Sequence, residues 1–457
     1  MRVAITAPLF AWEALEDSPS LHTLREFLAC VPDGDLLYAL QRQRGKGRDD
    51  YPVGVLWGTL LLTIVLRHPS IEACLSELQR NAALRALIGI ASEDQVPKKW
   101  NMSRFLQLLG HEPFRSMSQA LFNCMIGRLG QVVPDLGATT AGDSAALNAR
   151  REKSGKAHAK RRSRDPLPEP AGGRKEYKDE SGNVTHAVEW FGYKFHLLVD
   201  VKHEVALAYR ISSTKTGDNE MLPELVGQAA VNLPQGRTRT LAYDKAADDS
   251  KVHRCLNEAG ILPLIQIRSL WKDQTEQMLP GHKGDSNIVY DEAGTVYCYD
   301  KVSDPPVRHK MAYLGHEGQR GTLKYRCPAR HGGWRCPSES VCNAGKTYGL
   351  TVRVKREIDL RRFPPIPRAT KQFERCYKGR TAVERVNARV KVFWGADDGN
   401  IAGAYRFHAF LGAVMIVHAG LATLLAAAPR REGTLGKMRL SPIARALRQK
   451  AGLADTP

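Results

Sequence analysis

The first part of the chain carries apolar residues at helical spacing. Residues 53–68 form an apolar run, and residues 71–90 place apolar side chains on one face of a helix. The pattern continues over residues 96–110 and 113–129. We therefore predict a helical domain over residues 1–130, which either packs on the rest of the protein or holds DNA in a helix-turn-helix manner.

The middle of the chain carries strand-like runs instead. Residues 186–201 and 205–212 are rich in β-branched and aromatic residues and are separated by a short turn. Strand and helix then alternate, with helices at 220–231 and 247–260 and strands at 238–244 and 262–267. Two consecutive strands followed by alternating strands and helices predict an α/β fold, in which helices flank a mixed sheet.

Changes in composition suggest the domain boundaries. Residues 149–182 are basic, rich in Pro and Gly and without periodicity, which predicts a loop that either contacts DNA phosphates or is a solvated linker. Residues 268–368 are irregular and read as an insertion. The predicted organisation is a first core part at 131–267, the insertion at 268–368, C-terminal helices at 369–429 and a basic tail at 430–457.

One apolar stretch is nearly long enough to cross a membrane. It covers residues 410–429, but it contains His418, is rich in Ala and Gly, and has basic residues on both sides. The N-terminus gains acidic residues before any long apolar run, unlike a signal peptide. We interpret the stretch as a buried core helix and predict no membrane association.

Overall charge points to a polyanionic partner. Sixty-seven Lys and Arg face 48 Asp and Glu, a net charge of +19, and such a field attracts nucleic acid. A hydrophobic fraction of 43% is enough for real cores and argues against global disorder. Nine scattered cysteines do not resemble a disulfide framework, so reduced thiols in the cytoplasm fit better.

Two aspartates are the first candidate site residues. Asp143 follows a short strand-compatible segment, and Asp244 ends the apolar strand at 238–244. Sites in open α/β sheets lie at strand ends, and carboxylates on neighbouring strands suit Mg²⁺ or Mn²⁺. A lone Asp in such a place is also a common turn former or helix cap. The competitors are Asp135, Asp248 and Asp249, with Asp218 and Glu220 either near the site or capping the next helix.

A third acid lies on the helix predicted at 382–394. Treated as one continuous helix, Tyr377, Arg380, Glu384 and Lys391 fall within roughly a 60° arc. A polar helix face is by itself usually only solvated.

These four residues read as Y-x2-R-x3-E-x6-K, which resembles the signature of bacterial insertion-sequence DDE transposases. The segments around Asp143 and Asp244, the strand FGYKFHLLVDV and the N-terminal helices are similar to the same family, so the resemblance covers roughly residues 50 to 425. One departure is that Lys245, Ala246 and Ala247 follow Asp244, where an aromatic residue is common in this group.

The resemblance implies an RNase H-like core behind a helical domain. Asp143, Asp244 and Glu384 would bind two Mg²⁺ or Mn²⁺ ions, and Tyr377, Arg380 and Lys391 would hold phosphates near the transposon end. The resemblance also implies cleavage of double-stranded DNA at transposon ends and strand transfer into target DNA. The enzyme would act as a dimer on DNA, in the cytoplasm and associated with the nucleoid. Two alternatives stay open: an inactive, transposase-derived DNA-binding protein, and a divalent-metal nuclease of the same fold.

The insertion contains a second candidate metal site. Cys327, His331, Cys336 and Cys342 lie close together in sequence, with Cys298 upstream. Cys and His are zinc ligands, although the spacing is not the tight paired form of many zinc sites. The sequence leaves a structural Zn²⁺ at the first four residues open against reduced thiols in a loop-rich segment.

Overall fold

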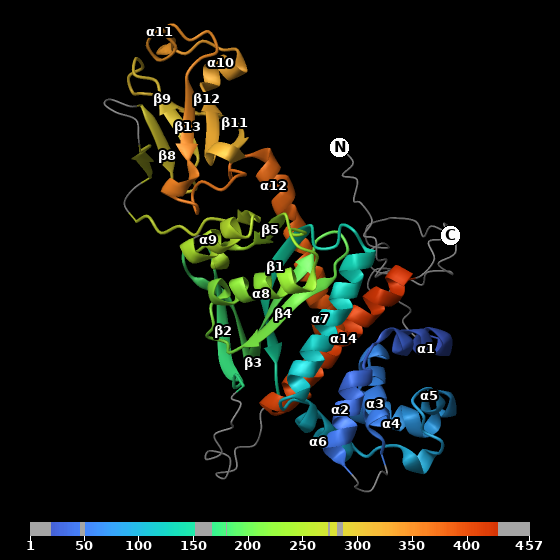
Figure 1. Ribbon diagram of the computed structural model, residues 1–457. Coiled ribbons are helices and arrows are strands. Elements are labelled where there is room, and N and C mark those ends of the chain that lie inside the picture. The colour runs from blue at the N-terminus through green and yellow to red at the C-terminus, as the bar shows by residue number, and fades with distance from the viewer. Residues whose placement is uncertain are drawn as a thin grey trace, which may run out of the picture.

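The computed structural model describes most of the chain (Figure 1). The predicted tail at 430–457 and residues 151–166 of the predicted basic loop lie outside the described residues. The described ranges are 20–45, 51–150, 167–179, 181–272, 275–280 and 287–427.

Helices make up the described N-terminal part, as the apolar spacing predicts. Nearly every residue of α3 is buried, which explains its lack of a polar face. Ser70 caps α4, because its side chain accepts a hydrogen bond from the Ala73 N–H at 3.1 Å. The helices are α1 (Leu21–Cys30), α2 (Gly34–Arg44), α3 (Val53–Val65), α4 (Ile71–Arg80), α5 (Ala82–Leu87), α6 (Lys99–Leu109) and α7 (Phe114–Val132).

A mixed sheet forms the centre of the molecule. Its core strands run in the order β4–β3–β1–β5–β6. The first three pair antiparallel, and β5 and β6 continue parallel to β1. This is the predicted RNase H-like sheet. The strands are β1 (Thr139–Asn148), β3 (Val184–Asp200), β4 (Ala206–Ser212), β5 (Thr240–Tyr243) and β6 (Leu262–Ile265).

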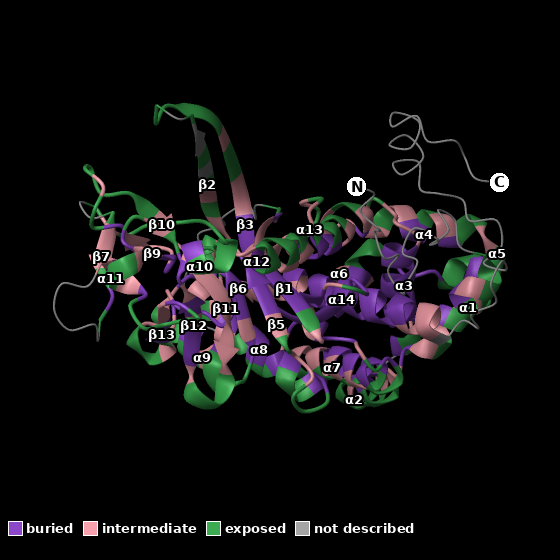
Figure 2. Ribbon diagram, turned by 90° about the horizontal axis from the view of Figure 1, so that it is seen from above, coloured by how far each residue is buried: buried purple, intermediate pink, exposed green. Residues whose placement is uncertain are grey.

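One strand was missed at the sequence level. Strand β2 (Ala171–Lys178) lies in the segment predicted as a loop and pairs antiparallel with the first half of β3. The two strands stand out from the body as a long hairpin (Figure 2). Gly and charged residues gave β2 no local strand signal, so its pairing with β3 decides its conformation.

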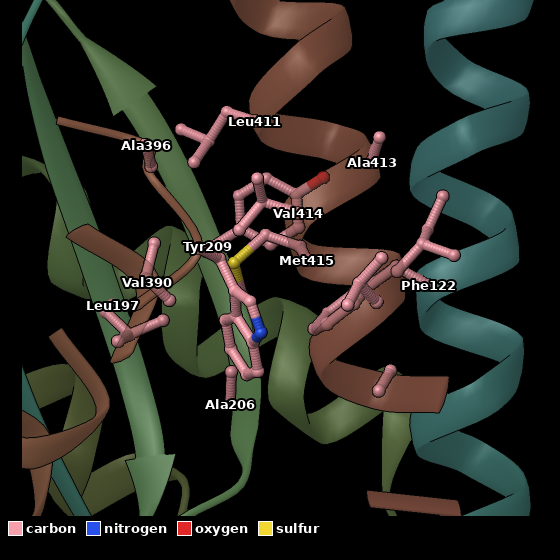
Figure 3. Close-up of a cluster of buried hydrophobic side chains, with 14 of the residues drawn as sticks. Phe122, Leu197, Ala206, Tyr209, Val390, Ala396, Leu411, Ala413, Val414 and Met415 are labelled. Atoms are coloured by element: carbon pink, nitrogen blue, oxygen red, sulfur yellow. The ribbon is translucent and has the colours of Figure 1, made fainter. Parts of the chain in front are cut away.

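Helices flank this sheet, and α14 fills the space between the sheet and the N-terminal helices. Figure 3 shows Val414 and Met415 of α14 between sheet residues such as Leu197 and Tyr209 on one side and Phe122 of α7 on the other. The helices around the sheet are α8 (Asp218–Asn232), α9 (Ser250–Glu258), α12 (Lys371–Tyr377), α13 (Thr381–Ala388) and α14 (Ala404–Ala427).

The apolar stretch predicted as a core helix is α14. Within the described part of the chain it is the one helix long and apolar enough to span a bilayer, yet 78% of its most apolar window is buried inside the protein. Its His418 is fully buried, and its Nε2 accepts the Ala206 N–H at 2.9 Å. Burial lowers the pKa of His418 to about 3, so the imidazole is neutral and ties α14 to the start of β4.

The insertion is more regular than predicted, which corrects the expectation of an irregular segment. It contains two small antiparallel sheets around a hydrophobic core of its own, separate from the main core. Its elements are β7 (Glu276–Met278), β8 (Ile288–Asp291), β9 (Val296–Tyr299), β10 (Arg308–Lys310), β11 (Ala312–Glu317), β12 (Thr322–Arg326), α10 (Pro328–Gly332), α11 (Glu339–Cys342) and β13 (Thr351–Lys355).

Gly192 marks the point where β3 meets both β1 and β2, and it tolerates no side chain. A Cβ there would lie 1.9 Å from the Leu147 carbonyl oxygen. We expect Gly192→Ala to lower the free energy of unfolding by about 3 kcal/mol, because the backbone of two paired strands would have to separate. Urea unfolding of the full chain measures this.

Gly227 provides the matched control. It is exposed on α8, and a Cβ there meets no atom within 4 Å. Gly227→Ala should be neutral or stabilising by up to about 1 kcal/mol, because Ala favours the helix. Equal stability of the two variants would contradict the close approach at Gly192.

Candidate active site

Asp143 and Asp244 lie at equivalent positions on two neighbouring parallel strands. Ala141 of β1 pairs with Ala242 of β5, and each aspartate comes two residues later in its own strand direction. Asp244 follows β5 directly, as predicted, and its side chain accepts the Ala246 N–H at 2.8 Å. Asp143 is in the middle of β1 rather than at its end, because β1 continues past β5 and pairs with β3 to Asn148.

Glu384 approaches the aspartates through Arg380. The Arg380 guanidinium lies 2.6 Å from Glu384 Oε1 and 3.4 Å from Asp143 Oδ2. Glu384 is on the first turn of α13, and its side chain is 52% exposed. One guanidinium therefore stands between two of the three predicted catalytic acids.

A buried apolar face and a pair of ion pairs fix the helix that carries Glu384. Val383 and Val386 of α13 are fully buried in the main core. Arg385 and Arg389 both form ion pairs with Glu204, a buried residue in the turn between β3 and β4. Packing on one face and the ion pairs on another hold α13 against the sheet.

Burial makes Asp143 hard to ionise. Its pKa rises to about 6, chiefly through desolvation, while the Ser144 N–H and Arg380 act against the rise and Asp244 and Asp218 add to it. A cation bound beside Asp143 would therefore favour the ionised form of this carboxyl group.

Asp218 is a further carboxylate at this place, which the sequence could only suggest. It is buried at the start of α8, accepts a hydrogen bond from the Ser144 hydroxyl at 3.0 Å and pairs with Lys194 Nζ at 2.6 Å. Lys194 is a charged residue within the apolar run that forms the second half of β3, a signal that sequence reasoning missed. Glu220 is exposed in the first turn of α8.

The remaining two residues of the predicted signature occupy different surroundings. Tyr377 is half-buried beside Arg380, and its ring stacks on Phe373 at 5.6 Å between centroids. Lys391 pairs with Asp397 at 3.1 Å, and Asp397 also accepts hydrogen bonds from Asn148 at the end of β1.

The helix is not continuous, which corrects the single-arc prediction. A 3₁₀ turn at Lys378–Arg380 precedes α13, and a π-helical turn at Arg389–Phe393 follows it. A π turn holds more residues than an α turn, so Lys391 does not keep the direction that a uniform 100° per residue assigns to it.

The competing aspartates have other partners. Asp135 pairs with Lys202 and His203, and the hydrogen bond from Lys202 contributes most to lowering its pKa to about 2. Asp249 caps α9 through the Lys251 N–H. Asp248 is buried and forms ion pairs with Arg361 and Arg368.

The donor set suits a hard divalent cation. Asp143, Asp244 and Glu384 offer only carboxylate oxygens, which Mg²⁺ and Mn²⁺ prefer. Among the residues that the structure describes, no three or more His, Cys, Asp or Glu side chains are already placed to hold a metal ion. Ion binding by all three acids therefore requires Arg380 to move away from at least one of them.

The structure places three of the four predicted zinc ligands around one cavity and the fourth outside it. Cys327, Cys336 and Cys342 line one cavity of the insertion together with Cys298. His331 is exposed on α10 and does not line it.

Comparison with known families agrees with this architecture. Residues 158–419, more than half of the chain, match the family model described as Transposase DDE domain. This region begins after Asp143 and includes Asp244 and Glu384. Residues 13–108 match the Transposase domain (DUF772). No curated protein matches the chain.

Proposed function

The chain belongs to the family of transposases with a DDE domain, and from this premise we propose that Asp143, Asp244 and Glu384 catalyse cleavage at transposon ends and strand transfer into target DNA. The family itself implies transposition and a divalent metal ion. The residues that do the chemistry, the two-step reaction and the assignment to insertion-sequence transposases with the Y-x2-R-x3-E-x6-K signature are our proposal.

The observation that carries this proposal is the meeting of three chain segments. Asp143 and Asp244 share one position on adjacent parallel strands, and Arg380 connects Asp143 with Glu384 from α13. If Arg380 formed only a structural ion pair, one acidic partner would be enough. Such a pair does not explain a nearly buried Asp143 facing two further carboxylates.

The proposed reaction has two steps. Water first attacks a phosphorus at the transposon end, which breaks one phosphodiester and frees a 3′-OH. That hydroxyl then attacks a target phosphorus, forming a new phosphodiester while the target 3′ oxygen leaves and takes up a proton. Two bound Mg²⁺ ions would activate the attacking oxygen and stabilise the leaving one.

Side chains of the protein would position the metal ions and the DNA for both steps. The carboxylates of Asp143, Asp244 and Glu384 would hold the ions. Arg380 pairs with both Asp143 and Glu384 before DNA binds, and its planar guanidinium suits a bidentate contact with a DNA phosphate afterwards. Tyr377, beside it, would hold a phosphate through its hydroxyl. Lys391 would reach DNA only by leaving Asp397.

The other assignments are proposals on the same premise. The N-terminal helical domain would contact DNA, as would the basic segment around residues 149–182. Two copies would act together on paired transposon ends in the nucleoid, because both ends must be joined to one target. The net charge of +19 supports a large DNA contact.

A cleavage and joining assay tests the proposal. The full chain would be incubated with labelled DNA carrying the flanking ends of its own gene, with Mg²⁺ or with EDTA. We expect cuts at the ends and joined products with Mg²⁺ only. Tight binding without metal-dependent cutting would indicate an inactive DNA-binding derivative, and random cutting without joining would indicate a nuclease.

A further inference from the structure

Four cysteines of the insertion surround one small cavity. Cys298 lies on β9, Cys327 follows β12, Cys336 is in the loop after α10, and Cys342 ends α11. The cavity has a volume of about 20 Å³, room for one water-sized atom. These segments are at most 44 residues apart in the sequence, but they belong to different sheets and helices, so the four cysteines come to one cavity only in the folded insertion.

Nitrogen–hydrogen groups point at three of the four sulfurs. Asn343 Nδ2 lies 3.6 Å from Cys327 Sγ, and Asn287 Nδ2 lies 3.8 Å from Cys342 Sγ. The Ser338 backbone N–H donates to Cys336. Such donors stabilise a sulfur that carries negative charge, and similar contacts support the ligands of metal sites.

The two amides are held in this orientation by other bonds. The side-chain Oδ1 of Asn343 accepts the Leu350 N–H at 2.6 Å, which leaves Nδ2 of the same amide facing Cys327. Asn287 Nδ2 also donates to the Tyr299 carbonyl oxygen. The donors are therefore part of the fold of the insertion rather than freely rotating groups.

The cavity and its donors together suit a metal ion. Four cysteines line the cavity, and amide N–H groups that would stabilise a thiolate lie against two of the sulfurs. This arrangement fits a site completed by a metal ion, because a coordinating thiol is deprotonated.

We propose that Cys298, Cys327, Cys336 and Cys342 bind one structural Zn²⁺. Four thiolates satisfy the tetrahedral preference of zinc and leave no open position for catalysis. The sulfurs are not yet at ligand positions, so the loops around α10 and α11 would close slightly on the ion. In this set Cys298 takes the place of His331, the ligand predicted from the sequence.

His309 is the competing fourth ligand. It lines the same cavity, but its Nε2 lies 3.8 Å from Asp300 Oδ2, and its ring packs on Trp334 at 4.9 Å between centroids. The cysteine on β9 needs no change of partner, whereas the imidazole would have to turn from Asp300. We therefore assign the fourth position to Cys298.

The site would stabilise the insertion, whose hydrophobic core is small. In the described part of the insertion its buried cluster holds ten residues, and a metal in the cavity would connect β9 with the α10–α11 segment. The proposal does not depend on the catalytic function, because its readouts are metal content and thiol accessibility rather than DNA cleavage.

The first test uses the unaltered full chain. Purified from zinc-supplemented cells and dialysed, it should retain one zinc per chain, and a mercurial that titrates thiols should release that zinc as four thiols react. With Co²⁺ in place of zinc, we expect strong thiolate-to-metal charge-transfer absorption and the spectrum of a site with four sulfur ligands. A zinc-free protein whose nine cysteines all react freely would overturn the proposal.

Substitutions assign the ligands. Cys298→Ser should lose the bound zinc, while His331→Ala, His309→Ala and the control Cys255→Ser, on α9 outside the insertion, should keep it. Full zinc retention in Cys298→Ser, or its loss in His309→Ala with a changed cobalt spectrum, would refute the four-cysteine set. Should Cys298→Ser fail to fold, the four-thiol stoichiometry of the unaltered chain still decides.

Discussion

Glu384→Gln is expected to reduce the rate of Mg²⁺-dependent cleavage at transposon ends by about 10³-fold while leaving DNA affinity within about twofold. The substitution removes the charge of one proposed ligand but keeps the shape of the side chain. Its amide oxygen can still accept a hydrogen bond from Arg380, and the side chain is 52% exposed, so the fold should be unaffected. Single-turnover cleavage and a binding titration measure the two effects.

Glu374→Gln is the matched control for this change. Glu374 lies on α12, is 68% exposed and pairs with Lys378, so the substitution makes the same change of charge one short segment away. It should cleave DNA at nearly the unaltered rate. Normal cleavage by Glu384→Gln would remove Glu384 from the site, and equal loss in both variants would point to charge rather than catalysis.

The strand that ends at Asp244 could be predicted because its signal is local, whereas the strand around Asp143 is mostly small residues and gives a weak signal. An apolar strand followed at once by Asp244, and a helix after it, is visible within twenty residues. The chain order of strands and helices then limits the topology, which places β1 beside β5. Because β1 and β5 are neighbours, Asp143 and Asp244 lie at equivalent positions in the sheet.

The surroundings of the site could not be predicted in the same way. Arg380 and Asp143 are 237 residues apart, and nothing local shows that one guanidinium joins Asp143 with Glu384. Lys391 was placed by assuming a uniform helix, but the π turn at Arg389–Phe393 changes its direction. Packing of Val390 and Trp394 into the main core, a tertiary effect, accompanies that change.

Tertiary pairing also explains the other differences. Strand β2 forms against β3 although its own residues favour a loop, and the strands of the insertion have three to six residues, too short for a clear pattern. Sequence proximity favoured His331 beside the three cysteines, whereas the fold brings Cys298 from β9 to the same cavity.

Asp248→Ala is expected to lower the free energy of unfolding by about 3–5 kcal/mol, far more than loss of a proposed catalytic acid. The Asp248 carboxylate is fully buried and receives Arg361 Nε at 2.7 Å, the Arg268 N–H at 2.7 Å and His253 Nε2 at 3.1 Å. Burial alone would raise the pKa of Asp248, but these hydrogen bonds and the charges of Arg361 and Arg368 lower it, so the group is ionised. Urea unfolding at neutral pH measures the loss.

This substitution distinguishes a structural acid, Asp248, from the proposed catalytic acid Asp244, four residues away in the sequence. Without Asp248, two nearly buried guanidinium groups, Arg361 and Arg368, lose their counter-charge at the base of the insertion. Asp249→Ala, which removes only the cap of α9, should cost about 1 kcal/mol. Asp244→Asn should leave stability nearly unchanged and abolish cleavage. The opposite result would be a stable but inactive Asp248→Ala variant together with an active Asp244→Asn variant. That result would assign the second catalytic acid to Asp248 instead of Asp244.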